Sequence, residues 1–384
     1  MSYTERTRSG VGGDDERMAE IDGLLKLMAE RGASDLHIKA GAPPAVRLHT
    51  RLVVLNEVGK LTPEQTKMLA LGMMDEHQAS ILESGHEVDF AYSLSGVGRF
   101  RVNAFQQRGS IALTLRRVSM ERQSVEELGL PPVIRRLADE PRGLVLVTGT
   151  AGSGKTTTLA SMIDHINSSR DGHIVTIEDP IEVMHADKRC LVTQREIGID
   201  TDSYADALRH VVRQDPDVIL IGEMRDFDTV SAALTAAEIG NLVFSTLHTI
   251  DATETINRVI DFFPPHQQQQ VRLMLGSTLK GIVSLRLIPS IQGGLVPAVE
   301  VLVMTGTIRE CIIDPDKTYL IRDSMEEGMY YGMQTFDQSL LRLYQDGKIT
   351  LDDATAFAHN AHDFAIKVRQ LGIDPTAVGE SGIY

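Results

Sequence analysis

The stretch Leu144-Val-Leu-Val-Thr148, followed by Gly149-Thr-Ala-Gly-Ser-Gly154-Lys155-Thr156, decides the fold of this chain. The first part is an apolar run typical of a buried strand, and the second matches the P-loop pattern with the correct spacing. The segment after it predicts a helix, because apolar residues recur at helical spacing at Leu159, Met162, Ile163 and Ile166. A glycine-rich loop between a strand and a helix exposes backbone N–H groups that converge on phosphate oxygens. The alternative, a glycine-rich turn without a ligand, does not explain this context.

Two side chains of this loop have defined roles in phosphate chemistry. Lys155 is expected to place a positive charge near the β- and γ-phosphates, and the Thr156 hydroxyl is the expected Mg²⁺ ligand. The predicted cofactors are therefore ATP and Mg²⁺. The predicted nucleotide-binding residues are Gly149, Thr150, Ala151, Gly152, Ser153, Gly154, Lys155, Thr156 and Thr157.

Three further polar residues follow apolar, strand-like runs. Glu178 follows Ile174–Ile177, Glu223 follows Val218–Ile221, and His248 follows Leu242–Thr246. Ligands of open α/β sheets bind beyond the carboxyl ends of the strands, so the three side chains are expected to line one site. Glu223 is the candidate general base for an attacking water. Glu178 is expected to hold Mg²⁺ through water or to orient the nucleophile, and His248 to contact the γ-phosphate. A structural acid or histidine is the ordinary alternative at each position.

The order of segments predicts two domains. Residues 142–372 alternate apolar strands with helices, which indicates an α/β domain with a parallel sheet covered on both faces, followed by C-terminal helices from about Pro264. Residues 16–118 predict a smaller α+β domain, and residues 119–141 predict a proline-containing linker with one short helix. Loose tails are expected at 1–15 and 373–384.

Arginines on neighbouring strands of the small domain form a second candidate group. Arg99 and Arg101 share one strand face, and Arg116 faces outward on the next strand. If residues 105–110 form the hairpin loop, all three arginines cluster on one surface. A solvated face is the simpler interpretation. The alternative is that they reach the γ-phosphate bound by a neighbouring subunit, which requires a ring.

Composition excludes several classes of protein. The net charge is −15 and Trp is absent among 384 residues, which argues against a motor that binds nucleic acid. Cys190 and Cys311 are far apart, which predicts two free core thiols and excludes a four-cysteine zinc site. Neither a signal peptide nor an apolar run of about 18 residues is present, so a cytoplasmic location is expected without direct membrane insertion.

Several motifs together resemble the PilT/PilU group of the secretion-superfamily (GspE/PilT-like) ATPases, the type IV pilus retraction motors. The resemblance extends from about Met18 to Asp374. Besides the P-loop, it is carried by Gly32-Ala-Ser-Asp-Leu-His37, Thr176-Ile-Glu-Asp-Pro-Ile-Glu182, Gly222-Glu-Met-Arg-Asp226, Ser245-Thr-Leu-His-Thr249, Asn257-Arg-Val-Ile-Asp-Phe-Phe-Pro264 and Gly332-Met-Gln-Thr-Phe-Asp337.

This resemblance implies a RecA-like C-terminal domain and a PAS-like N-terminal domain. It implies a homo-hexamer that hydrolyses Mg-ATP, docks on an inner-membrane pilus platform protein at the cytoplasmic face, and drives pilus retraction and twitching motility. A second retraction ATPase is a further implied partner. By the same resemblance, Glu223 is the catalytic base, Glu178 the acidic-box residue and His248 the histidine-box residue. Arg99, Arg101 and Arg116 match the N-domain arginines.

Three segments depart from the usual family pattern or distinguish its members. Asn241 stands where a histidine is usual, and Thr307–Asp314 matches the retraction-specific segment only loosely. The segment His362–Lys367 resembles the PilU side of the group. The alternatives left open are an accessory PilU-like motor, a pilus assembly or type II secretion motor, a RecA-like nucleic-acid motor, and a scaffold that binds nucleotide without hydrolysis. Two isolated cysteines argue against the assembly and secretion motors, most of which carry a four-cysteine zinc module.

Overall fold

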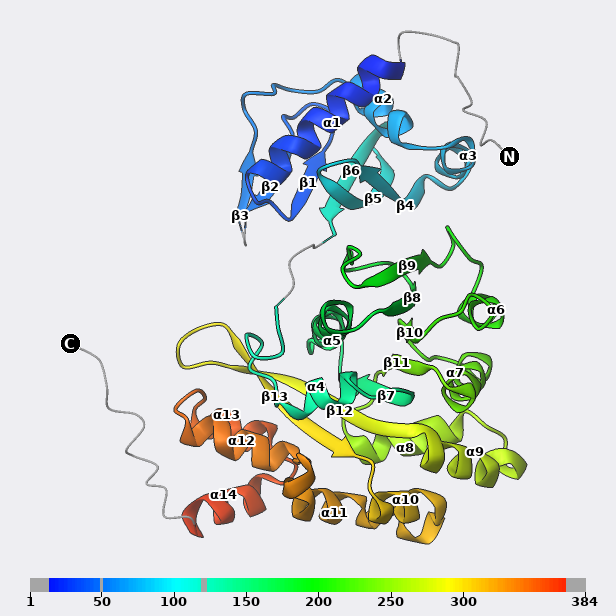
Figure 1. The fold of residues 1–384 in the computed structure, drawn as a ribbon. Helices are drawn as coiled ribbons and strands as arrows, with labels where there is room; N and C mark the ends of the chain where they lie inside the picture. The colour runs from blue at the N-terminus through cyan, green and yellow to red at the C-terminus, as the bar shows by residue number, and fades with distance from the viewer. Residues whose placement is uncertain (1–13, 49–50, 119–122, 371–384) are drawn as a thin grey trace, which may run out of the picture. The chain divides into compact units, whose positions relative to one another are not determined.

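The computed structural model describes residues 14–48, 51–118 and 123–370, and the chain divides into two compact units, residues 1–120 and 121–384 (Figure 1). The loose tails predicted at 1–15 and 373–384 lie outside the described residues, except that the first helix already begins at Asp14. No helix within the described ranges is both long enough and apolar enough to cross a membrane.

The first unit is a six-stranded antiparallel sheet in the order β3-β2-β1-β6-β5-β4 with three helices (Figure 1). Its elements are α1 (Asp14–Glu30), β1 (Asp35–Ile38), β2 (Ala45–Leu48), β3 (Arg51–Val54), α2 (Pro63–Met73), α3 (Glu76–Gly85), β4 (Glu87–Leu94), β5 (Gly98–Gln107) and β6 (Ser110–Arg117). The apolar sides of α1 and α2 share one core with the sheet. The apolar pattern did not predict β1 and β4, because β1 has only four residues and β4 carries two acids.

The hairpin between β5 and β6 is tighter than predicted. The prediction of a loop at residues 105–110 is wrong, because Gln107 pairs with Ser110 and the turn consists only of Arg108 and Gly109. Both turn residues have positive φ, 50° and 75°, as two-residue hairpin turns require. The register differs from the predicted one by two residues. Because the side-chain period of a strand is also two, Arg101 and Arg116 remain on one face, as predicted, and they are now direct partners.

The second unit is built on a seven-stranded sheet in the order β13-β12-β7-β11-β10-β8-β9, parallel except for the edge strand β13. The strands are β7 (Gly143–Thr148), β8 (Gly172–Glu178), β9 (Cys190–Glu196), β10 (Val218–Ile221), β11 (Leu242–Leu247), β12 (Leu279–Pro289) and β13 (Leu295–Val303). The helices are α4 (Val133–Ala138), α5 (Lys155–Ser169), α6 (Tyr204–Val211), α7 (Phe227–Ile239), α8 (Ala252–Asp261), α9 (Pro265–Thr278), α10 (Gly306–Ile313), α11 (Ile321–Glu327), α12 (Phe336–Gln345), α13 (Leu351–Phe357) and α14 (Ala361–Gln370), with short 3₁₀ turns η1 (Pro315–Leu320) and η2 (Gly328–Tyr331).

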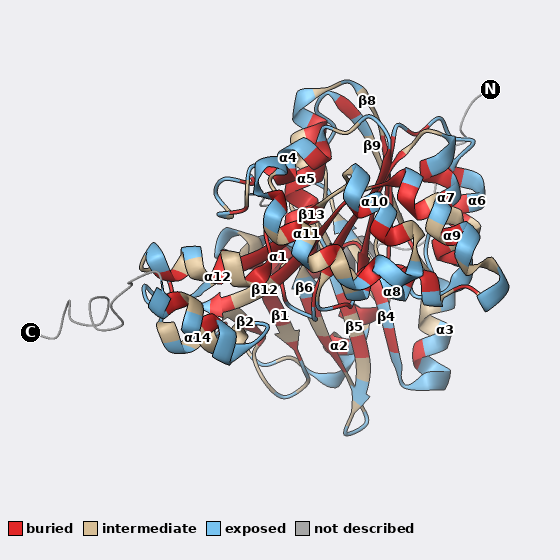
Figure 2. Cartoon of the chain, turned by 90° about the horizontal axis from the view of Figure 1, so that it is seen from below, coloured by how far each residue is buried: buried red, intermediate tan, exposed pale blue. Residues whose placement is uncertain are grey.

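The central strand β7 is buried on both faces, as predicted. Leu144 and Leu146 pack in one core with α6 to α11, and Val145 and Val147 pack in another with α4 and α5. Figure 2 shows the buried residues running along the strands of this sheet. Each fully buried Val or Leu side chain contributes about 1.5–3 kcal/mol to folding. This packing fixes the carboxyl end of β7, where the P-loop begins.

The region after Pro264 is not only helical, which corrects the prediction. After α9, the strands β12 and β13 form an antiparallel hairpin that joins the sheet, with β12 parallel to β7. A continuous apolar run does not distinguish a buried strand from a buried helix by periodicity, which explains the error. The apolar spacing of Phe336, Leu340, Leu341 and Tyr344 predicts a helix face here, and α12 confirms it: Phe336, Leu340 and Tyr344 are buried, Leu341 is partly buried, and the face packs with α13 and α14 against the far end of this hairpin. Both cysteines are free and buried, as predicted.

The segment predicted as a linker contributes to the second unit. Val125, Leu130, Ile134 and Leu137 are buried in the core that contains α5. Pro141 and Arg142 connect this packed segment directly to β7.

A buried carboxylate joins two helix starts in the second unit. Glu300 on β13 accepts a hydrogen bond at Oε1 from the N–H of Ala252, the first residue of α8, at 2.8 Å. It also accepts one from the backbone of Phe336, the first residue of α12. Burial, with a smaller contribution from the charge of Asp251, raises the pKa of Glu300 to about 7 against the lowering effect of these hydrogen bonds and of Arg286.

We expect the substitution Glu300→Gln to change how stability depends on pH. A carboxyl with a folded pKa of about 7 and an ordinary value of 4.5 binds more protons folded than unfolded between these pH values. The free energy of unfolding therefore falls as pH rises from about 4.5 to about 7. Glutamine does not ionise, so the variant should be more stable than wild type at pH 8, and the difference should shrink toward pH 5.

Urea unfolding followed by circular dichroism at pH 5 and pH 8 measures this difference. The exposed Glu238 on α7 provides the matched control, Glu238→Gln, which should retain the wild-type dependence. An unchanged pH dependence in Glu300→Gln would contradict the assignment.

Candidate nucleotide-binding site

The P-loop leaves β7 at Gly149 and enters α5 at Lys155. Gly149 has φ +142°, and a Cβ at this position would lie 2.4 Å from Ser153 Oγ and 2.6 Å from the Leu285 carbonyl oxygen. Only glycine therefore allows the loop to pass this close to β12. The apolar side of α5 is buried against the sheet, which holds the loop in place from its other end.

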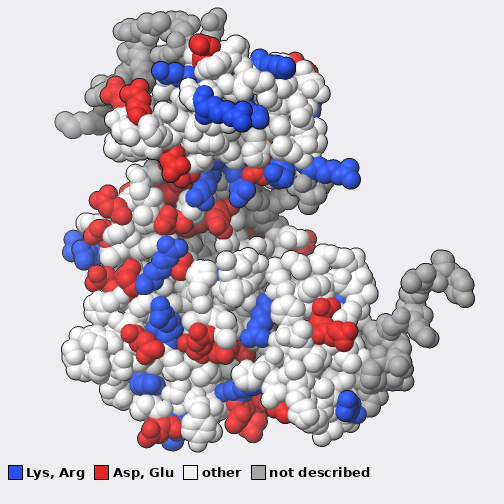
Figure 3. All heavy atoms as spheres, turned by 180° about the vertical axis from the view of Figure 1, so that it is seen from behind, with Lys and Arg blue, Asp and Glu red and all other residues white. Residues whose placement is uncertain are grey.

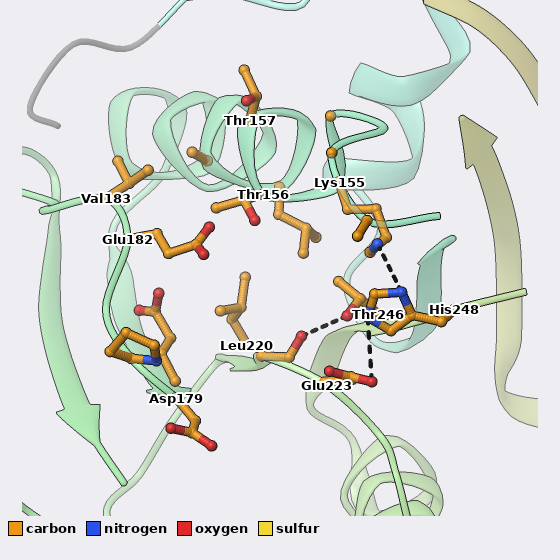
Figure 4. A pocket seen from close by; sticks show the side chains of 18 of the residues that line it. Lys155, Thr156, Thr157, Asp179, Glu182, Val183, Leu220, Glu223, Thr246 and His248 are labelled. Carbon is orange, nitrogen blue, oxygen red and sulfur yellow. Dashed lines mark hydrogen bonds and ion pairs between the residues drawn. The ribbon is translucent and has the colours of Figure 1, made fainter. Parts of the chain in front are cut away.

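A pocket of about 560 Å³ lies at the carboxyl ends of the neighbouring strands β7, β11, β10 and β8 (Figure 4). Of the predicted nucleotide-binding residues, it is lined by Ala151, Gly152, Gly154, Lys155, Thr156 and Thr157. Glu178, Glu223 and His248 also line it, so the structure brings the three predicted strand-end residues together with the P-loop. Gly149, Thr150 and Ser153 are not among the residues that line it.

The ammonium group of Lys155 lies at the centre of these contacts. The residue is only 9 % exposed, and its Nζ donates to the carbonyl oxygens of Gly149 at 2.8 Å and Thr150 at 2.9 Å. Nζ also lies 3.4 Å from His248 Nδ1. Burial lowers the pKa of Lys155, and the carboxylates of Glu223 and Glu182 oppose that shift. The site is therefore cationic at its base and acidic on the facing wall.

Glu223 is held from two sides. Its side chain is 16 % exposed, with Oε2 at 2.7 Å from Arg225 Nη2 and Oε1 at 3.5 Å from His248 Nε2. An ammonium group only donates, so this contact has His248 Nδ1 as the acceptor, and Nε2 is the ring nitrogen that faces Glu223. Lys155, His248 and Glu223 thus form one continuous series of contacts, which Figure 4 shows.

Glu178 is the most deeply buried acid of the pocket. Its Oε1 accepts hydrogen bonds from Thr176 Oγ1 at 2.6 Å and from Gln194 Nε2 at 3.1 Å. Burial raises the pKa of Glu178 above its ordinary value, although these hydrogen bonds lower it. Its expected contact with Mg²⁺ through water stays a prediction.

Arg99, Arg101 and Arg116 lie on one face of the first unit's sheet, as the strand pattern predicted. Arg101 is exposed, and Arg116 Nε donates to Asp35 Oδ1 at 2.7 Å. Asp35 is only 4 % exposed; burial raises its pKa, but hydrogen bonds from Arg116 and Ser34 outweigh burial and hold it below the ordinary value. The arginine contact with a phosphate of a neighbouring subunit stays a prediction.

The polar pocket residues that were not predicted as site residues include Asp179, Glu182, Tyr204 and Arg225. Asp179 and Glu182 belong to the acidic motif, and Arg225 to the motif after β10, so the sequence contained a signal for these three. Tyr204, on α6, belongs to none of the quoted motifs. Burial raises the pKa of the Tyr204 hydroxyl, and the charge of Asp179 adds to this effect.

The donor set of the pocket fits Mg²⁺ that arrives with a nucleotide. The Thr156 hydroxyl and the carboxylates of Glu178 and Glu223 line the same space. No group of three or more His, Cys, Asp or Glu residues in the described part of the chain is arranged to hold a metal. Mg²⁺ in phosphate sites uses one or two protein oxygens and takes the remainder from phosphates and water, so the residues present are sufficient.

Comparison with known proteins identifies the family. The family described as "Type II/IV secretion system protein" matches residues 18–295. The chain belongs to this family. The "Type IV pilus retractation ATPase PilT" of Pseudomonas aeruginosa is 44 % identical, covering 90 % of this chain and 100 % of that protein. The "Type IV pilus ATPase PilU" of the same organism is 42 % identical over 91 % of each chain. A "Twitching motility protein" of Neisseria gonorrhoeae is 42 % identical, covering 84 % and 86 %.

Solved structures agree with this membership. A crystal structure of the pilus retraction motor PilT with bound ADP superposes with a TM-score of 0.82 at 48 % identity, covering 89 % of this chain and 98 % of that one. The ATPase DotB of Legionella pneumophila gives a TM-score of 0.73 at 25 % identity, covering 96 % and 98 %. The predicted fold class, a RecA-like P-loop core with a smaller α+β domain, is confirmed, as is the resemblance to the PilT/PilU group. The chain is an ATPase of this family.

We expect Gly149→Ala to destroy the nucleotide site. The added Cβ would overlap Ser153 and the main chain of β12, so the loop must move, and ATP affinity should fall by more than about tenfold. Isothermal titration with ATP measures the loss. Gly306→Ala is the matched control, because nothing lies within 4 Å of the added atom and its φ is not positive. Wild-type affinity in Gly149→Ala would contradict the close approach.

Proposed function

We propose that this protein is a hexameric, Mg-ATP-hydrolysing motor that drives type IV pilus retraction and thereby twitching motility. The observation that supports this most strongly is the position of the Glu223 carboxylate in the pocket of Lys155, in a chain that aligns over nearly its whole length with PilT and PilU. A phosphate-binding loop facing a held carboxylate is the arrangement that hydrolysis of a γ-phosphate needs.

The roles of the pocket residues follow from their positions. The P-loop N–H groups and Lys155 bind the phosphates, and the Thr156 hydroxyl holds the metal. Mg²⁺, when bound, neutralises charge on the phosphate oxygens. Glu223 accepts a proton from the attacking water, because it is the acid held beside Lys155 through His248. His248 contacts the γ-phosphate, and Glu178 orients the water or holds the metal through water.

Conversion of hydrolysis into movement requires the first unit. Arg99, Arg101 and Arg116 of one subunit close on the γ-phosphate bound to its neighbour and neutralise the developing charge. The hydrogen bond from Arg116 to buried Asp35 supports this role, because Nε is fixed and the two terminal nitrogens remain for an anion. Hydrolysis and product release then let the two units of each subunit rotate, and the ring does work on its partner.

The partner is an inner-membrane pilus platform protein, which the motor engages from the cytoplasm, and a second retraction ATPase is a further candidate. Nucleic acid is not expected as a partner, because the net charge is −15. Figure 3 supports this: acidic and basic side chains are interspersed on the described surface of the face it shows.

An accessory, PilU-like motor is the second candidate. The identities to PilT and PilU are nearly equal, 44 % and 42 % over similar lengths, so similarity alone does not separate them. The difference is physiological, because a principal motor is required for retraction and an accessory motor only strengthens it.

A mixing experiment tests the arginine contact between subunits. Arg101→Glu and Glu223→Gln should each lower turnover by a factor of about 10³ or more, with ATP affinity largely retained. Rings mixed from the two variants should regain part of the activity, because some sites combine an intact Glu223 with an intact Arg101 of the neighbour. Arg108→Glu, exposed in the turn of the same hairpin, is the matched control and should keep wild-type turnover. Mixed rings as inactive as either variant would place the arginine contact within one subunit or exclude it.

Deletion of the gene in its own organism tests the direction of force. We expect excess surface pili and no twitching, because pili assembled by another motor would not be withdrawn. Pilus counts by electron microscopy and twitching zones in agar are the measurements. Normal pili with weakened twitching would establish the accessory motor instead, and bald cells would overturn retraction in favour of assembly.

A further inference from the structure

The loop that carries Glu223 is anchored at every second residue. Met224 is buried, and its N–H donates to the carbonyl of Thr246 at 3.1 Å. Asp226 caps α7 by accepting from the N–H of Thr229 at 2.8 Å. Glu223 and Arg225 flank the buried Met224, and both line the nucleotide pocket. The contact between Glu223 and Arg225 therefore forms within a loop whose backbone is held in place at Met224 and Asp226.

The two oxygens of Glu223 have different partners. Oε2 lies 2.7 Å from Arg225 Nη2, within hydrogen-bond distance, whereas Oε1 lies 3.5 Å from His248 Nε2. His248 in turn contacts Lys155, so Oε1 is the oxygen that faces Lys155, where the phosphates are proposed to bind. A carboxylate rotates easily about its terminal torsion, which exchanges the positions of its two oxygens. A guanidinium bound to one oxygen stops this rotation and so determines which oxygen faces the pocket.

We propose that Arg225 is a positioning residue for ATP hydrolysis, which holds Glu223 through Oε2 so that Oε1 receives the proton of the attacking water. The inference rests on the proposed ATPase mechanism and adds an atom assignment to it. The Arg225 side chain is 62 % exposed, so its guanidinium group binds Glu223 from the edge of the pocket. It therefore leaves the space in front of Oε1 open. A lysine at this position would offer a point charge in place of a planar fork.

Steady-state kinetics of phosphate release test the role. Arg225→Ala should lower kcat by about tenfold or more, because Oε1 is no longer held toward the water, while KM for ATP changes by less than about twofold. Arg225→Lys should recover part of the loss. Arg209→Ala is the matched control, since Arg209 is an exposed arginine paired with Asp206 on α6, and it should keep the wild-type kcat.

A double-mutant cycle separates positioning from direct contact with phosphate. If Arg225 acts only through Glu223, then Arg225→Ala should cause no further loss in a Glu223→Gln background. An additional loss comparable to that in wild type would overturn the inference and assign Arg225 to the phosphates. If Arg225→Ala does not fold by circular dichroism, Arg225→Gln takes its place in the cycle.

The outcomes also separate this inference from the proposed function. Loss of turnover in Glu223→Gln together with wild-type kcat in Arg225→Ala overturns the inference alone. Wild-type turnover in Glu223→Gln overturns the proposed base, and the role of Arg225 with it. Loss in both single variants without further loss in the double variant supports both proposals.

Discussion

The ammonium of Lys155 is a buried charge, and burial of a charge is unfavourable unless oxygen atoms surround it. Two carbonyls of its own loop and the acids of the facing wall meet this requirement. The carbonyls are within reach because Gly149 lets the loop pass against β12. The acids are within reach because β7, β11, β10 and β8 are neighbours and parallel, so their carboxyl ends supply the P-loop, His248, Glu223 and Glu178 to one space. The candidate phosphate site is thus a consequence of strand order.

The buried carboxyl group of Glu300 links this site to the C-terminal helices by direct contacts. The loop that carries His248 runs into α8, whose first N–H binds Glu300, and the same carboxylate binds the start of α12. Arg286 from β12 lies 3.9 Å above the ring of Phe336, also in α12. The helices α12 to α14 are therefore attached to the strand end that carries His248, which gives the proposed motor a packed route from nucleotide to its C-terminal surface.

The parts of the molecule that were predictable are those whose signal is local. The P-loop and the central strands combine glycine positions with apolar runs, and both features are visible within a dozen residues. The hairpin of β12 and β13 was missed because a continuous apolar run fits a strand or a helix, and β9 was missed because five of its seven residues are only partly buried or exposed. The contact between Glu223 and Arg225 was missed for another reason. Its motif was recognised, but a side-chain pairing depends on which residue between them is buried, here Met224.

The central claim is that ATP is bound and hydrolysed at Lys155. Phosphate release from Mg-ATP by the purified full-length protein, compared with Lys155→Ala under the same conditions, tests it most directly. The account predicts steady release by wild type and none above background by the variant, with both proteins folded by circular dichroism. Equal release by the two, or no release by either, would contradict a catalytic site at this loop and leave a scaffold that binds nucleotide without hydrolysing it.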